Sequence, residues 1–262
     1  MSFFSGYKPS PSNQNDKSFD LVVPAMLKES VSSASEHVIV ERTPISNQLG
    51  LSSCVANATC DALEIILGIE DPSNVVQLSR LLAYWNARSY THDTDKDGGT
   101  YISNAIDSFK TMGVCAESIW PYVEANVFVQ PPLSAYKESL DNKISECYRI
   151  DGNGRARCDN VEAAIRANHP VVLATAIDDA FCAYRGSSKV IGPPSTWIGF
   201  HAMIIVGVRG TPGQREFLLR NSWDVTWGDS QRPGHAWVTE NYIAWDQTND
   251  LWCITRVPTL VF

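Results

Sequence analysis

The apolar side chains of this 262-residue chain repeat with a helical period in the first half and with a strand-like pattern in the second half. Near residues 52–67, 78–85 and 102–109, apolar residues recur at intervals of three and four, which predicts amphipathic helices. From residue 171 onward, β-branched runs alternate with turn residues, which predicts antiparallel strands and hairpins. Helices followed by strands favour an α+β fold in which two lobes meet at a cleft.

Two polar residues, His201 and Asn221, lie at the ends of expected strands. The run at 171–177 is β-branched, the run at 201–208 is apolar, and residues 216–220 follow a turn-rich segment as the hairpin partner of the second run. His201 begins the second strand, and Asn221 follows the third. Because hairpin strands lie side by side, we expect His201 and Asn221 to meet at one end of the sheet.

Charge and apolar content exclude several classes of partner. The formal net charge is −8, and the 21 Lys and Arg are spread along the chain, so neither a nucleic-acid partner nor an anionic membrane surface is expected. No stretch approaches the roughly 18 apolar residues of a membrane span, and the N-terminus has no apolar secretory core. We expect a monomer made in the cytoplasm without a classical signal peptide. Export by a signal-independent route, for example as a bacterial effector, stays open.

The seven cysteines are odd in number and scattered, which indicates no dense disulfide framework. Cys54 stands at the expected start of the first helix, where free backbone N–H groups and the helix dipole favour a thiolate. For a lone cysteine, the alternative of a small buried apolar side chain is at least as common. A thiolate nucleophile, however, needs a histidine partner, and that histidine needs an acceptor to hold its tautomer. His201 and Asn221 can supply these two groups.

Three segments of the chain resemble, in order, the signature segments of the papain-like cysteine peptidases. His201 follows Cys54 within the roughly 130 to 150 residues typical of such enzymes, and Asn221 lies slightly beyond that range. The resemblance extends from about Pro44 to about Thr239. The segments are SNQLGLSSCVANATCDALE, GFHAMIIVGV and LLRNSWDVTWGD.

The resemblance implies a papain-like two-lobe fold with the active site in the cleft between the lobes. It divides the chain into a partly disordered N-terminal extension at 1–40, a helical lobe at 41–150 that carries the nucleophile, and a β-rich lobe at 151–262 that carries His201 and Asn221. The first 20 residues, rich in Ser, Pro, Asn and Lys, are expected to form a mobile or loosely docked tail with little chemistry of its own.

The same resemblance assigns roles to two further side chains. Gln48 would join the backbone N–H of Cys54 as the oxyanion-hole donor, and Trp223 would cover the pair formed by His201 and Asn221. Read without the resemblance, Gln48 is a surface residue in a turn. Trp227 belongs to the same segment, where ordinary core packing is an equal alternative.

Substrate-binding residues are implied on both sides of the cleft. Gly98 and Gly99 would form the wall along which the substrate backbone pairs as an added strand. Tyr101, Phe200 and Ala202 would border the pocket for the second residue before the scissile bond, which favours hydrophobic side chains there.

Departures from the family pattern indicate a divergent bacterial or viral branch rather than a lysosomal or plant enzyme. Leu51 stands where the family usually has a disulfide-bonded cysteine, Val55 stands in place of an aromatic residue, and Asp224 in place of a glycine. None of these changes removes a candidate catalytic group.

The segment DTDKDGGTYISN resembles a calcium loop at its start, but its twelfth position is Asn104 rather than a bidentate Glu. We therefore expect no metal and no other cofactor.

The function implied is that of a cysteine endopeptidase, which hydrolyses protein or peptide substrates through a thiolate and an acyl-enzyme. Two alternatives remain. One is a transpeptidase or acyl transferase that uses the same three groups. The other is an inactive family member that serves as a binding module.

Overall fold

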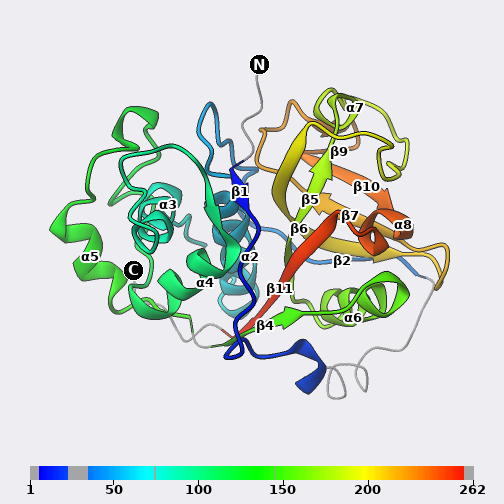
Figure 1. The fold of residues 1–262 in the computed structure, drawn as a ribbon, viewed down its shortest axis with the longest axis horizontal. Helices are drawn as coiled ribbons and strands as arrows, with labels where there is room; N and C mark the ends of the chain where they lie inside the picture. The colour runs from blue at the N-terminus through cyan, green and yellow to red at the C-terminus, as the bar shows by residue number, and fades with distance from the viewer. Residues whose placement is uncertain (1–5, 23–34, 74, 145, 257–262) are drawn as a thin grey trace.

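The computed structural model describes residues 6–22, 35–73, 75–144 and 146–256. Two lobes lie on either side of a long central helix, α2, and the N-terminal strand β1 runs between them (Figure 1). Residues Cys54–Gly68 of α2 are all buried, because both lobes cover this helix. The α+β fold with two lobes is confirmed.

The helical lobe contains four α-helices and two short elements within the described ranges. Its apolar stripes pack α3 against α4, and both helices against α2, as the periodicity predicts. The bounds are α2 Cys54–Glu70, α3 Arg80–Ser89, β3 Thr100–Tyr101, α4 Ile102–Thr111, the 3₁₀ helix η2 Glu124–Asn126, and α5 Leu133–Ser139.

The β-rich lobe is built on a seven-stranded sheet in which every described pair is antiparallel. The strand order is β10-β7-β6-β5-β11-β4, and β2 pairs with β6. The strands are β2 His37–Val38, β4 Glu146–Ile150, β5 Val171–Ile177, β6 Gly199–Arg209, β7 Glu216–Arg220, β10 His235–Thr239 and β11 Thr248–Arg256.

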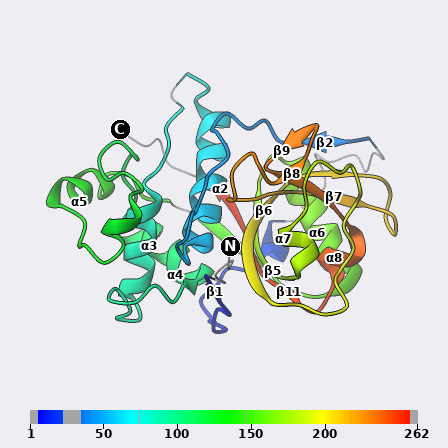
Figure 2. The same ribbon diagram turned by 90° about the horizontal axis from the view of Figure 1, so that it is seen from above.

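Short helices and a small ribbon complete this lobe. In the view of Figure 1, α6 lies below the sheet, α7 above it and α8 beside it. Figure 2 shows the same lobe from above. These elements are α6 Gly154–Arg166, α7 Asp179–Cys182, β8 Gly228–Asp229, β9 Arg232–Pro233 and α8 Glu240–Ala244. Strand β4 lies just before the expected lobe boundary at residue 150, yet it belongs to the large sheet.

The N-terminal segment is docked on both lobes, so the expectation of a loosely docked tail is wrong for residues 6–20. Strand β1, Tyr7–Lys8, pairs in parallel with β3. The 3₁₀ helix η1, Phe19–Leu21, buries Phe19 completely, and the Lys17 carbonyl accepts the Arg149 N–H at 2.8 Å. The rest of the expected tail, residues 1–5, lies outside the described residues.

None of the helices formed by the described residues is long and apolar enough to cross a membrane.

Candidate active site

Cys54 is the first residue of α2 and is fully buried. The residue before it, Ser53, is the N-cap but makes no side-chain capping bond. Its hydroxyl instead lies 2.5 Å from the Tyr122 hydroxyl and accepts a 3.0 Å bond from the Asn57 amide. The N–H groups at the start of α2 are therefore not satisfied by a capping side chain, and they remain available to an anion at Cys54.

His201 and Asn221 meet at the ends of neighbouring strands, as the hairpin predicts. The His201 Nε2 lies 2.7 Å from the Asn221 Oδ1, and the Ser222 N–H donates to the same oxygen at 2.8 Å. Because this oxygen accepts both bonds, Nε2 carries the proton and Nδ1 keeps its lone pair. The Asn221 Nδ2 is buried with no hydrogen-bond partner among the described residues.

The indole of Trp223 stacks on the His201 ring, with the ring centroids 4.4 Å apart and the planes inclined by 28°. Trp227 packs at right angles against Trp223, and its Nε1 donates to the Phe181 carbonyl at 2.9 Å. His201 is only 1% exposed. This burial lowers the pKa of His201 to about 4, although the hydrogen bond with Asn221 acts in the opposite direction.

Burial also determines the pKa of the Cys54 thiol. It raises the pKa of Cys54 to about 11, although the backbone N–H groups of Ala202, Gly6 and Val55 act to lower it. In this arrangement the thiol and the imidazole are both neutral at neutral pH. Within the described part of the chain no hydrogen bond joins them directly, but Ala202, whose N–H acts on the sulfur, is the residue next to His201.

Gln48 lies beside the same two elements and is 3% exposed, so it is no surface residue. Its backbone N–H donates to the Ser222 carbonyl at 2.9 Å, and its side-chain oxygen accepts the Ser222 hydroxyl at 2.9 Å. Its side-chain nitrogen donates to the Leu51 carbonyl at 2.9 Å. An amide nitrogen carries two hydrogens, so one N–H of Gln48 remains for a ligand.

The N-terminal segment occupies the path expected for a substrate. The N–H of Gly6 acts on the Cys54 sulfur, and the Gly6 carbonyl accepts the Thr100 N–H at 2.9 Å. The Tyr7 and Phe200 rings lie 6.2 Å apart between centroids, and the Lys8 ammonium lies 5.9 Å from the centre of the Tyr101 ring.

The backbones approach so closely here that only glycine fits. A Cβ added to Gly6 would lie 2.0 Å from the Ser52 carbonyl oxygen, and one added to Gly99 would lie 2.3 Å from the Gly6 oxygen. Gly99 also has a φ of 74°, which side chains rarely adopt. The chain's own N-terminal segment therefore lies against Gly99 and pairs with the next two residues, Thr100 and Tyr101, whereas a Cβ at Gly98 would meet nothing within 4 Å.

Contacts to both lobes hold this segment in place. The Tyr7 hydroxyl donates to Asn249 at 2.6 Å, and the Ser10 N–H donates to Asp250 at 3.2 Å. On the helical lobe, the Lys8 ammonium pairs with Asp93 at 3.1 Å. Sequence reasoning missed these residues; the available signal was the four aromatic residues of the first 20, Phe3, Phe4, Tyr7 and Phe19.

The neighbouring Asp97 is also committed to protein partners. Its carboxylate accepts the Ser52 N–H at 3.0 Å and the Tyr84 hydroxyl at 2.6 Å. Asp97 thus fixes the residues before Cys54 to the loop that carries the glycine wall.

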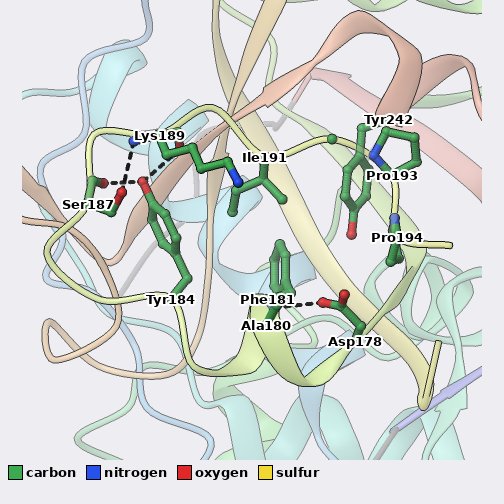
Figure 3. A pocket seen from close by; sticks show the side chains of 11 residues that line it. Asp178, Ala180, Phe181, Tyr184, Ser187, Lys189, Ile191, Pro193, Pro194 and Tyr242 are labelled. Carbon is green, nitrogen blue, oxygen red and sulfur yellow. Dashed lines mark hydrogen bonds between the residues drawn. The ribbon is translucent and has the colours of Figure 1, made fainter. Parts of the chain in front are cut away.

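A hollow of about 470 Å³ lies in the β-rich lobe between α7, the loop that follows it and α8 (Figure 3). Its wall includes Phe181, whose ring meets Trp223 edge-on at 6.0 Å. Neither Cys54 nor His201 lines it. The hollow is therefore separate from the catalytic groups, and Phe181 and Trp223 lie between it and His201.

The departures from the family pattern have structural counterparts. Asp224 adopts a φ of 66°, so it keeps the left-handed backbone typical of the glycine that it replaces. Its carboxylate accepts the N–H of Val225 at 2.6 Å. All seven cysteines are free.

The two-lobe fold, with a cysteine at the start of the buried helix and a histidine and an asparagine bonded on the facing sheet, defines a cysteine peptidase. The model of the family described as "Papain family cysteine protease" matches residues 28–242. The chain therefore belongs to this family.

Similar proteins come from viruses, bacteria and plants. An uncharacterized peptidase C1-like protein of Acanthamoeba polyphaga mimivirus is 28% identical over 216 residues, covering 79% of this chain and 68% of the viral protein. Chymopapain of Carica papaya is 27% identical, covering 71% of this chain and 49% of the plant protein. This chain thus spans between about half and two thirds of the length of these two curated relatives.

Among solved structures, xylellain, a cysteine protease from Xylella fastidiosa, is similar over nearly its whole length. Its TM-score is 0.80 at 25% identity, covering 97% of this chain and 96% of that one. The similarity to viral and bacterial proteins confirms the expected divergent bacterial or viral type.

Proposed function

We propose that Cys54, His201, Asn221 and Gln48 together hydrolyse peptide bonds through an acyl-enzyme. The observation that carries the proposal is the 2.7 Å bond between the His201 Nε2 and the Asn221 oxygen. It leaves the Nδ1 lone pair of the buried imidazole free to take a proton from the Cys54 thiol.

In the first half of the reaction, the His201 Nδ1 takes the thiol proton and the Cys54 sulfur attacks the peptide carbonyl carbon. The carbonyl oxygen becomes an oxyanion, which the backbone N–H of Cys54 and the second N–H of Gln48 receive. When this intermediate collapses, the C–N bond breaks and the imidazolium gives its proton to the leaving amine. The product is a thioester on Cys54.

In the second half, His201 takes a proton from water, and the hydroxide oxygen attacks the thioester carbonyl. The C–S bond breaks, the carboxylic acid leaves, and the sulfur regains its proton from the imidazolium. Asn221 holds the ring and its tautomer throughout, and Trp223 keeps water away from their hydrogen bond.

The substrate is an extended peptide that pairs its backbone with the wall at Gly98 and Gly99. The Tyr7 ring lies 6.2 Å from the Phe200 ring, and the Lys8 ammonium lies 5.9 Å from the centre of the Tyr101 ring. A pocket bordered by Tyr101, Phe200 and Ala202 would favour an apolar side chain at the second position before the scissile bond. The arrangement described here is a closed form, because Gly6 to Lys8 occupy that path.

The test is hydrolysis of a peptide library by the full chain and by Cys54→Ala, with products identified by mass spectrometry. We expect cleavage by the full chain, preferentially after an apolar residue at the second position, and none by the variant. Including a free amine acceptor separates hydrolysis from acyl transfer, because a transferase would give mainly the amide product. Cleavage by Cys54→Ala at the rate of the unsubstituted chain would refute the proposal.

A further inference from the structure

Arg220 is the residue immediately before Asn221 and is 2% exposed. All three nitrogens of its guanidinium are bonded to partners from two other segments, helix α2 and residues 41–44. Nε bonds Asp61 at 3.3 Å, Nη1 bonds Glu41 at 2.6 Å and the Thr43 carbonyl at 3.3 Å, and Nη2 bonds the Pro44 carbonyl at 2.6 Å.

The bond to Asp61 reaches the helix of the nucleophile. Asp61 lies two helical turns after Cys54 on α2, so both side chains belong to the same face of the helix. The Asp61 carboxylate is 1% exposed; it also pairs with Arg80 at 2.6 Å and accepts the Ser46 hydroxyl at 3.0 Å. This buried ion pair therefore fixes α2 against the strand that ends at Arg220, just before Asn221.

The bonds to the Thr43 and Pro44 carbonyls reach the segment that leads to Gln48. That segment is bonded a second time just beyond Arg220, where Ser222 binds Gln48 through both backbone and side chain. Arg220 and Ser222 thus hold the two ends of the 43–48 segment on either side of Asn221.

Glu41 is held between Arg220 and His235, which are directly paired residues of β7 and β10. The His235 Nε2 lies 3.0 Å from a Glu41 oxygen, and its Nδ1 lies 2.9 Å from the Pro233 carbonyl. His235 thus braces the carboxylate that orients Arg220. It does not contact the Cys54 thiol.

We propose that Arg220 is a positioning residue for catalysis, which sets the placement of Cys54, Gln48 and Asn221 relative to one another through its fixed fork of donors. The inference rests on the proposed function. A guanidinium bonds several acceptors in one plane, whereas an ammonium is a single point charge. Arg220→Lys therefore keeps the charge but cannot hold both α2 and the 41–44 segment. A misplacement of about 1 Å can cost about 100-fold in rate.

The chain offers a matched control at the other end of the same strand. Arg215 directly precedes β7 and is 1% exposed; it pairs with Glu240 at 2.5 Å and Glu162 at 2.9 Å, both within the β-rich lobe. Arg215→Lys therefore disturbs a buried ionic cluster of similar kind without touching α2 or the 43–48 segment.

The experiment compares the full chain with Arg220→Lys and Arg215→Lys by thermal unfolding, peptide hydrolysis and NMR of the His201 ring Nε2–H. We expect both variants to unfold at lower temperature. Only Arg220→Lys should lose kcat, by about 10- to 100-fold with KM changed less than threefold, and only it should shift the His201 signal. Equal losses of kcat in both variants, or an unchanged kcat and His201 signal in Arg220→Lys, would overturn the inference.

Asp61→Asn serves as a second variant if Arg220→Lys does not fold. It removes the same contact from the other side, so it should reproduce the loss of kcat and the His201 shift, and failure to do so counts against the inference. The NMR arm also separates the two proposals. If the unsubstituted chain hydrolyses no peptide, the proposed function fails, whereas a His201 signal that moves in Arg220→Lys alone still supports the positioning role.

Discussion

Substitution of Gly6 by alanine should uncover the Cys54 thiol. The added Cβ would lie 2.0 Å from the Ser52 carbonyl oxygen, so the segment must withdraw by about 1.5 Å to reach ordinary contact. Withdrawal lets water reach the sulfur, and burial is the main reason why the pKa of Cys54 is about 11 rather than 9.0. A return to 9.0 raises the thiolate fraction at neutral pH about 100-fold.

The assay is the rate of Cys54 alkylation by iodoacetamide at pH 7.5, with the labelled residue identified by peptide mass mapping. We expect the Gly6→Ala rate to exceed that of the unsubstituted chain by about 100-fold, since the thiolate is the reacting species. Gly192→Ala is the matched control, because a Cβ at Gly192 meets nothing within 4 Å. An unchanged rate at Cys54 in Gly6→Ala would refute the idea that the N-terminal segment shields the nucleophile.

Three further predictions concern the site and its backbone. Burial lowers the pKa of His201 from 6.5 to about 4. Between pH 6.5 and pH 4 the unfolded state therefore binds a proton that the folded state does not, so the free energy of unfolding falls by about 3 kcal/mol as the pH falls. In urea unfolding, the free energy of unfolding of His201→Phe should fall less between pH 7 and pH 4 than that of the unsubstituted chain; an equal fall in both would contradict this. In peptide hydrolysis, Asn221→Ala should be slow but measurable, and the double variant with His201→Ala no slower than His201→Ala alone; additive losses would exclude an orienting role. At Asp224, with a φ of 66°, the alanine variant should be less stable than the glycine variant by about 1 kcal/mol in thermal unfolding; equal melting temperatures would show that the backbone there is not constrained.

Local patterns in the sequence were enough to predict the elements that carry the site. The expected strands at 171–177 and 216–220 have these same bounds in the structure, and α2 begins at Cys54. The pairing of His201 with Asn221 follows from the hairpin. The helical repeat expected near 52–67 stops short of the end of α2, which continues to Glu70 because Gly68 keeps a helical backbone and lies against Arg42.

Features that depend on contacts between distant segments could not be predicted in this way. The polar composition of the first 20 residues indicates a mobile tail, whereas Gly6 fits between Ser52 and Gly99 only because two glycines without side chains meet there. The ion pair of Asp61 with Arg220 joins a helix to a strand far along the chain. No local period or propensity records such a contact.

The central claim is that Cys54 forms a covalent acyl intermediate with the help of His201. The most direct measurement is to quench a reaction with a peptide ester in acid within its first turnover and to map the acylated residue by mass spectrometry. We expect the acyl group on Cys54 alone, with none found in His201→Ala. Acylation of another residue, or hydrolysis without any acylated Cys54, would contradict the claim.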